Sequence, residues 1–77
     1  MIKMKKIMRI WIWLFNDKIY KAVCCEDEGT ITLYDENEAI LIKRTGLTRL
    51  QMKIFEANLA TAGAKRIDGQ QEPFTYL

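Results

Sequence analysis

Aromatic and basic side chains alternate near the start of the chain, at a spacing that would gather them on one face of a β-sheet. The set consists of Arg9, Trp11, Trp13, Phe15, Lys18 and Tyr20. Exposed aromatic rings can stack on nucleic-acid bases while neighbouring Lys or Arg side chains contact phosphates. The same residue types are enriched at the dominant positions of protein interfaces. This set is therefore the candidate interaction face, for a protein or for a nucleic acid.

A second basic pair, Lys65 and Arg66, is a candidate for further basic contacts. The net charge of +2 is small, but the charges are segregated along the chain. Residues 22–42 carry six acids and no base, and they lie between two basic segments, 1–21 and 43–66. Such blocks can either combine into a basic patch or pair with one another. We favour pairing, which weakens the case for nucleic acid.

Catalysis is disfavoured by the residue types that are missing. The chain has no histidine, which is the commonest general base and the usual partner of a nucleophilic cysteine or serine. The acids cluster in predicted turns without the spacing of a calcium loop. The four glycines are scattered singly, so no phosphate-cradling motif is present. We therefore predict no enzyme activity, no catalytic residue, no cofactor and no small-molecule substrate.

The two cysteines, Cys24 and Cys25, are adjacent. Neighbouring side chains on a strand point to opposite faces, so this pair cannot readily form a disulfide. Without histidine or further cysteines, the pair also lacks the ligands of a usual metal site. We predict no metal and two small buried residues in a reducing cytosol.

The first residues imitate a signal peptide, because lysines precede an apolar run over residues 7–15. Arg9 interrupts that run, and Asn16 and Asp17 follow it where a signal peptide has a small-residue cleavage site. The run is also shorter than the roughly 20 residues that a membrane-spanning helix needs. We therefore expect a cytoplasmic protein without a membrane span.

The apolar run predicts the central strand of a sheet, and both of its faces are apolar. Asn16 and Asp17 suit a two-residue hairpin turn, which leads to a second strand over residues 18–25. This turn places Leu14 opposite Ile19 and separates an aliphatic face from an aromatic face. The aliphatic face holds Ile10, Ile12, Leu14, Ile19 and Val23, and the aromatic face holds Trp11, Trp13, Phe15, Tyr20 and Ala22.

Two more strands are predicted, over residues 30–34 and 39–43. A three-residue loop ending at Gly29 would put Ile31 and Leu33 on the aliphatic face. The register of the last strand stays open, because a three-residue loop turns Leu41 to that face and a two- or four-residue loop turns its neighbours there. We favour the second register on the number of apolar side chains; it assigns Ile40 and Ile42 to the aliphatic face and Lys43 to the aromatic one.

A helix follows the fourth predicted strand, because the apolar period changes to 3.6. Thr48 predicts its N-cap, and Gln51 three residues later completes a capping box. The helix is predicted to end at Ala62, with Gly63 as the left-handed residue after it. The polar residues predicted to lie outside its buried arc are Arg49, Lys53 and Glu56. We predict that this helix covers the aliphatic face of the sheet.

The chain is therefore predicted to be one α+β domain over residues 1–77. A four-stranded antiparallel meander occupies residues 2–44, and one C-terminal helix over residues 48–62 packs on one face of the sheet. The tail from residue 64 is expected to dock or to add a short strand. Residues 74–77 either dock on the domain or bind a partner.

The expected function follows from the sheet face that the helix leaves uncovered. A domain of this size buries only about 60% of its unfolded surface, so a large uncovered apolar face is costly. We expect a small non-enzymatic binding module that pairs with itself as a homodimer, or with another protein, through the apolar sheet face. Nucleic-acid binding through the aromatic and basic face is the alternative.

Overall fold

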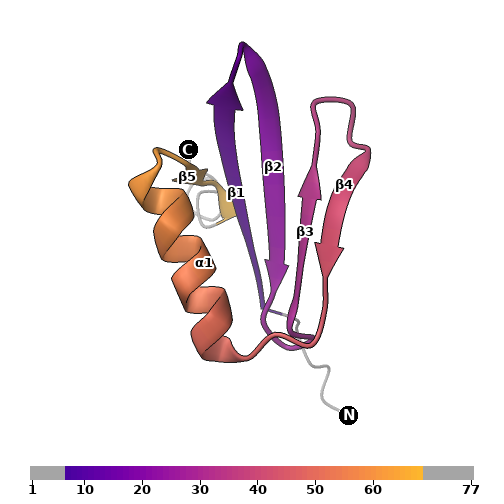
Figure 1. Ribbon diagram of the computed structural model, residues 1–77, viewed down its shortest axis with the longest axis vertical. Helices are drawn as coiled ribbons and strands as arrows, with labels where there is room; N and C mark the ends of the chain where they lie inside the picture. Colours follow the sequence, from indigo (N-terminus) through magenta and orange to yellow (C-terminus); the bar gives the residue numbers. More distant parts are fainter. Residues whose placement is uncertain (1–6, 69–77) are drawn as a thin grey trace, which may run out of the picture.

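The computed structural model describes residues 7–68 as an antiparallel sheet of five strands with one helix (Figure 1). The elements are β1 (Met8–Phe15), β2 (Lys18–Cys25), β3 (Thr30–Tyr34), β4 (Ile40–Arg44), α1 (Arg49–Thr61) and β5 (Lys65–Arg66). Their order across the sheet is β4-β3-β2-β1-β5. The predicted α+β class is confirmed, and β5 is a strand beyond the four predicted. Residues 74–77 lie outside the described part of the chain.

Asn16 and Asp17 form the two-residue turn between β1 and β2. Both residues have positive φ angles, 53° and 64°, as a type I′ hairpin requires. Leu14 lies opposite Ile19, and the pairing continues regularly along both strands. The hairpin prediction is confirmed, including the separation of an aliphatic face from an aromatic one.

The loop from β2 to β3 is one residue longer than predicted. Cys25 lies opposite Thr30, so the loop comprises residues 26–29. Side chains alternate along a strand, and a shift of one residue therefore moves each of them to the other face. Ile31 and Leu33 lie on the aromatic face, and their predicted place on the aliphatic face is wrong.

Gly29 closes this loop against the segment that leads into α1. Its φ angle is +66°, and its carbonyl accepts a hydrogen bond from the Leu47 amide at 2.9 Å. A Cβ atom on Gly29 would lie 2.6 Å from the Leu47 carbonyl oxygen. This contact joins the four-residue loop to a residue far along the chain.

We expect Gly29→Ala to destabilise the fold by about 2–4 kcal/mol, from the left-handed backbone and from the clash with Leu47. Gly46→Ala is the matched control, because Gly46 has a similar φ of +70° and a Cβ atom there would meet no other atom within 4 Å. The control is expected to lose only the backbone contribution, about 1–2 kcal/mol. Urea unfolding measures both losses, and equal values would contradict the close contact.

β4 pairs with β3 through an irregular register. Ile40 and Ile42 lie opposite neighbouring residues of β3, so Leu41 is an extra residue in the strand. A bulge of this kind turns its flanking side chains to opposite faces. Ile42 lies on the same face as α1, whereas Ile40 and Lys43 lie on the other face. Neither predicted register of this strand is right, since each assumed regular pairing.

The two ends of α1 follow the prediction. The Thr48 hydroxyl accepts from the Gln51 amide at 3.1 Å, and the Gln51 side chain accepts from the Thr48 amide at 2.9 Å. After the helix, the amides of Gly63 and Ala64 donate back to carbonyls of the last turn, as in a Schellman motif. Within residues 7–68, no helix is long and apolar enough to cross a membrane.

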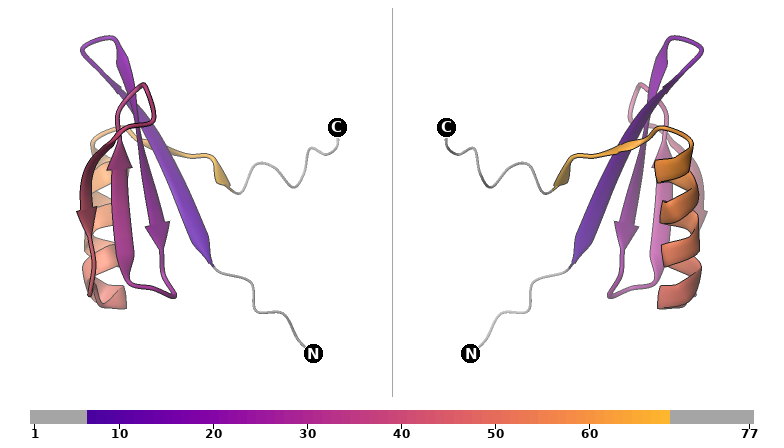
Figure 2. Two further views of the ribbon diagram at one scale, coloured as in Figure 1. Left: turned by 90° about the vertical axis from the view of Figure 1, so that its right-hand side faces the viewer. Right: turned by 90° about the vertical axis from the view of Figure 1, so that its left-hand side faces the viewer.

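The helix packs on the aromatic face of the sheet, so the predicted coverage of the aliphatic face is wrong. Met52 of α1 is buried against Cys24 and Ile31, and Trp11 and Leu33 pack around this cluster. The register of the β2–β3 loop explains the difference, because it adds two aliphatic side chains to the aromatic face. Figure 2 shows the helix on one side of the sheet only.

Both cysteines are buried and free, as the adjacent pair predicts. Cys24 lies beneath α1, where burial raises the pKa of its thiol to about 12. A thiol with such a pKa stays protonated at neutral pH and is a poor nucleophile. Cys24 therefore has a packing role.

Candidate interaction surfaces

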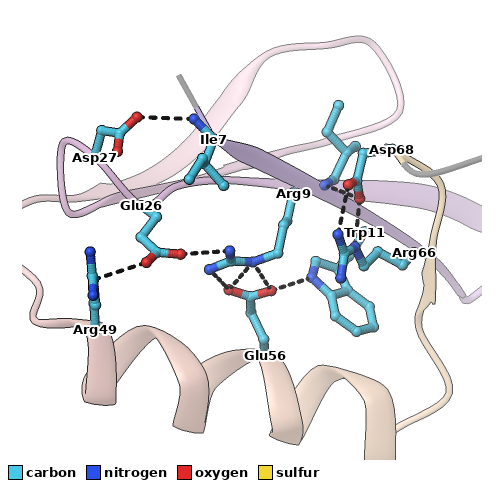
Figure 3. A network of polar contacts seen from close by, with 10 residues as sticks. Ile7, Arg9, Trp11, Glu26, Asp27, Arg49, Glu56, Arg66 and Asp68 are labelled. Atoms are coloured by element: carbon cyan, nitrogen blue, oxygen red, sulfur yellow. Dashed lines mark hydrogen bonds and ion pairs between the residues drawn. The ribbon is translucent and has the colours of Figure 1, made fainter. Parts of the chain in front are cut away.

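The six residues of the predicted interaction face do not form one surface. Arg9 and Trp11 lie beneath α1 and bind one of its side chains (Figure 3). The other four lie near the turn of the β1–β2 hairpin, and the end of this hairpin extends beyond α1 (Figure 1). These four are Trp13, Phe15, Lys18 and Tyr20. The structure therefore divides the candidate face into a structural part and an accessible part.

Glu56 of α1 joins the helix to β1. Its carboxylate accepts hydrogen bonds from Nε and Nη2 of Arg9, each at 2.9 Å, and from Nε1 of Trp11 at 2.9 Å. Glu56 is only 7% exposed, so its predicted place outside the buried arc of the helix is wrong. The hydrogen bonds that Arg9 donates to Glu56 and Glu26 raise the pKa of Arg9 above its ordinary value. Arg9 therefore stays charged and compensates the buried carboxylate.

Glu26 extends this network toward the start of the helix (Figure 3). It accepts from Nη1 of Arg9 at 2.7 Å, and it forms an ion pair with Nε of the exposed Arg49 at 2.9 Å. Glu38 pairs in the same way with Lys21 at 2.8 Å. The acidic segment therefore pairs with neighbouring basic segments, as we favoured from the sequence.

Asp68 anchors the last described residues to β1. Its carboxylate accepts from Nε and Nη2 of Arg66, at 2.8 and 2.9 Å, and from the Ile10 amide at 3.0 Å. Arg66, a predicted basic contact, is therefore held by this carboxylate. Lys65 is exposed beside Ile12, on the face of the sheet opposite α1. Lys65 and Arg66 therefore lie on opposite faces of the sheet.

Acid is expected to weaken the fold through Glu26 and Asp68. Hydrogen bonds from Arg9 and Arg66, respectively, lower the pKa values of these carboxyls below their ordinary values of 4.5 and 3.8. A carboxyl with a lower pKa in the folded chain takes up a proton on unfolding at acid pH. Its contribution to the stability of the fold is therefore complete above the ordinary pKa, and it is lost as the pH falls from that value through the lower pKa of the folded chain.

We therefore expect the thermal midpoint to fall as the pH drops below about 4.5. Thermal unfolding at stepped pH values measures this dependence. Asp68→Asn is expected to flatten it, whereas Glu36→Gln, at an exposed turn residue, is the control. A midpoint that stays constant through this range would contradict the contribution of these ion pairs.

The hairpin that extends beyond α1 carries an aromatic cluster, which we call the aromatic hairpin. Trp13 stacks with Tyr20 at a centroid distance of 6.0 Å and an interplanar angle of 21°, and Phe15 tilts against Tyr20 at 6.4 Å. Phe15 is 60% exposed, and its pairing partner Lys18 is exposed beside it. This cluster offers rings and one positive charge to a partner.

The side of the sheet opposite α1 carries an aliphatic stripe, which we call the open face. Its members are Met8, Ile10, Ile12, Leu14, Ile19 and Val23. Leu14 and Ile19 are 67% and 55% exposed, and α1 lies on the other side of the sheet (Figure 2). Sequence reasoning identified these residues but assigned the helix to them, because the length of the β2–β3 loop carries no clear local signal.

Comparisons with protein-family models, with curated proteins and with solved structures find no match to this chain. Within residues 7–68, no group of three or more His, Cys, Asp or Glu side chains could hold a metal ion. The open face and the aromatic hairpin are therefore the features from which we infer a function.

Proposed function

We propose that the chain is a small non-enzymatic binding module that associates with a second copy of itself through the open face. The supporting observation is the aliphatic stripe on the side of the sheet away from α1. A chain of 77 residues has a folding free energy of roughly 4–12 kcal/mol. Burying one large aliphatic side chain contributes about 1.5–3 kcal/mol, so covering several of them adds a comparable stabilisation.

A second copy would cover the open face with apolar surface of the same kind. Isologous pairing places the aliphatic stripe against itself and requires no other complementary surface. One margin of the face carries Lys65, on β5. Near the turns at the other end of the face, Asp17, Asp35, Glu36 and Glu38 line a hollow with Ile12 and Ile19. Lys21 also lines this hollow and pairs with Glu38, and Lys43 lies on the same face of β4, so the region is net acidic but not free of bases. A two-fold axis along the strands would bring Lys65 of one copy toward the side of the sheet on which the other copy carries these acids.

Sedimentation equilibrium over a range of micromolar concentrations tests this function. We expect a species of twice the 9.0 kDa chain mass at the upper end of the range. A strictly monomeric chain throughout the range would contradict self-association through the open face.

Nucleic-acid binding through the aromatic hairpin is the second candidate. The stacked and partly accessible pair of Trp13 and Tyr20 supports it, with Lys18 nearby as a phosphate contact. Residues 7–68 carry nine basic and nine acidic residues, so the described part of the chain has no net positive charge to attract phosphates. Tryptophan fluorescence titrated with single-stranded oligonucleotides at low salt tests this candidate. Unchanged fluorescence would contradict it.

A further inference from the structure

A groove opens on the helix side of the sheet, away from the open face. Ile54 and Phe55 of α1 form one wall, and Leu33 and Ile42 of the sheet form the other. Leu47 also lines the groove, and the cavity volume is about 350 Å³. Ile54 and Ile42 are 54% and 44% exposed, so both walls present apolar surface that this fold leaves accessible. The volume lies at the lower end of the range for small-molecule sites.

The polar lining of the groove offers positive charge and N–H donors. It comprises Arg44, Gln51 and Asn58, and no carboxylate of the described residues lines the groove. Arg44 is exposed and forms no ion pair within residues 7–68. The Gln51 oxygen accepts from the Thr48 amide, and its NH₂ group therefore keeps its two donors for another acceptor.

We propose that this groove binds a medium-chain carboxylate, with the hydrocarbon chain between α1 and β4 and the carboxylate at Arg44. The apolar walls match a hydrocarbon chain, and Arg44, with no carboxylate beside it among the described residues that line the groove, matches an anionic head group. An extended peptide added to the outer edge of β4 fits less well. The bulge at Leu41 and the charges of Lys43 and Arg44 are features that protect an edge strand from pairing.

This site lies on the helix side of the sheet, so it goes beyond the proposed self-association. Binding in the groove and pairing through the open face can therefore succeed or fail independently.

Chemical-shift mapping of the ¹⁵N-labelled full chain with decanoate tests the proposal. We expect saturable shifts centred on groove residues such as Leu33, Ile42 and Phe55. Decyltrimethylammonium, with the same chain length and the opposite charge, is expected to bind more weakly. Shifts centred on the open face, or equal binding of the cationic amphiphile, would overturn the proposal.

Two matched pairs of variants locate the ligand. Ile54→Asp is expected to raise the dissociation constant at least tenfold, because it removes apolar surface and places a negative charge in the groove. Leu50→Asp, at an exposed position of the same helix outside the groove, is expected to leave it unchanged. Equal effects of the two variants would overturn the site.

The second pair tests the head group. Arg44→Gln is expected to raise the dissociation constant about threefold to fivefold, the size of one partly exposed ion pair. Lys43→Gln removes the same charge from the neighbouring residue, which lies on the other face of β4, and is expected to have no effect. An unchanged dissociation constant for Arg44→Gln would overturn the role of Arg44.

Discussion

Arg9→Met is expected to destabilise the fold by about 3–5 kcal/mol, because it leaves the buried carboxylate of Glu56 without its cationic partner. Among the described residues, Trp11 would remain as a donor to this carboxylate, and a single neutral donor does not compensate a buried charge. The total folding free energy of a chain this size is roughly 4–12 kcal/mol, so the variant approaches the limit of stability. Urea unfolding followed by circular dichroism measures the loss.

Two control variants separate the buried charge from other effects of the substitution. Arg49→Met removes the exposed ion pair with Glu26 and is expected to cost less than about 1 kcal/mol. The double variant Arg9→Met with Glu56→Gln removes both charges of the ion pair and leaves an amide oxygen that can accept from Nε1 of Trp11. We therefore expect the double variant to be more stable than Arg9→Met alone. If it is equally unstable, the uncompensated carboxylate is not the cause of the loss.

Features with local signals could be predicted from the sequence. The hairpin turn consists of Asn16 and Asp17 alone, and both residue types tolerate the positive φ angles that it requires. Thr48 and Gln51 satisfy each other's backbone amides within one turn of helix, and Gly63 ends that helix with its own backbone geometry. No distant residue is needed for any of these features, and all of them are confirmed.

Features that depend on distant contacts could not be predicted. A left-handed Gly29 suits a loop of three or four residues, and in the four-residue loop of the folded chain Gly29 also contacts Leu47, far along the sequence. The extra loop residue moves Ile31 and Leu33 to the aromatic face of the sheet. This is also the face that α1 covers.

The burial of residues on the candidate interaction face also depends on distant contacts. The alternating pattern of β1 correctly predicts that its aromatic residues share one face of the sheet. It does not predict which of them lie beneath α1. A periodicity argument also assigns a charged Glu56 to the solvent side of the helix. Its partner Arg9 lies 47 residues away in the sequence, and this distant pairing makes the burial possible.

Leu14→Asp is expected to raise the dissociation constant of the dimer at least a hundredfold if the open face is the interface. Each isologous dimer contains the substitution twice, and each copy loses about 1.5–3 kcal/mol of apolar burial. The folded monomer is expected to change by no more than about 0.5 kcal/mol, because Leu14 is exposed in the single chain. Sedimentation equilibrium measures the first effect, and urea unfolding under monomeric conditions measures the second.

Phe15→Asp is the matched control, because Phe15 is the next residue of β1, is similarly exposed and belongs to the opposite face. It is expected to leave the dimer intact and to remove any oligonucleotide binding by the aromatic hairpin. The reverse result, in which Phe15→Asp dissociates the dimer and Leu14→Asp does not, would move the interface to the aromatic hairpin. Adjacent residues on one strand thus distinguish the two faces, because alternation sends their side chains to opposite sides of the sheet.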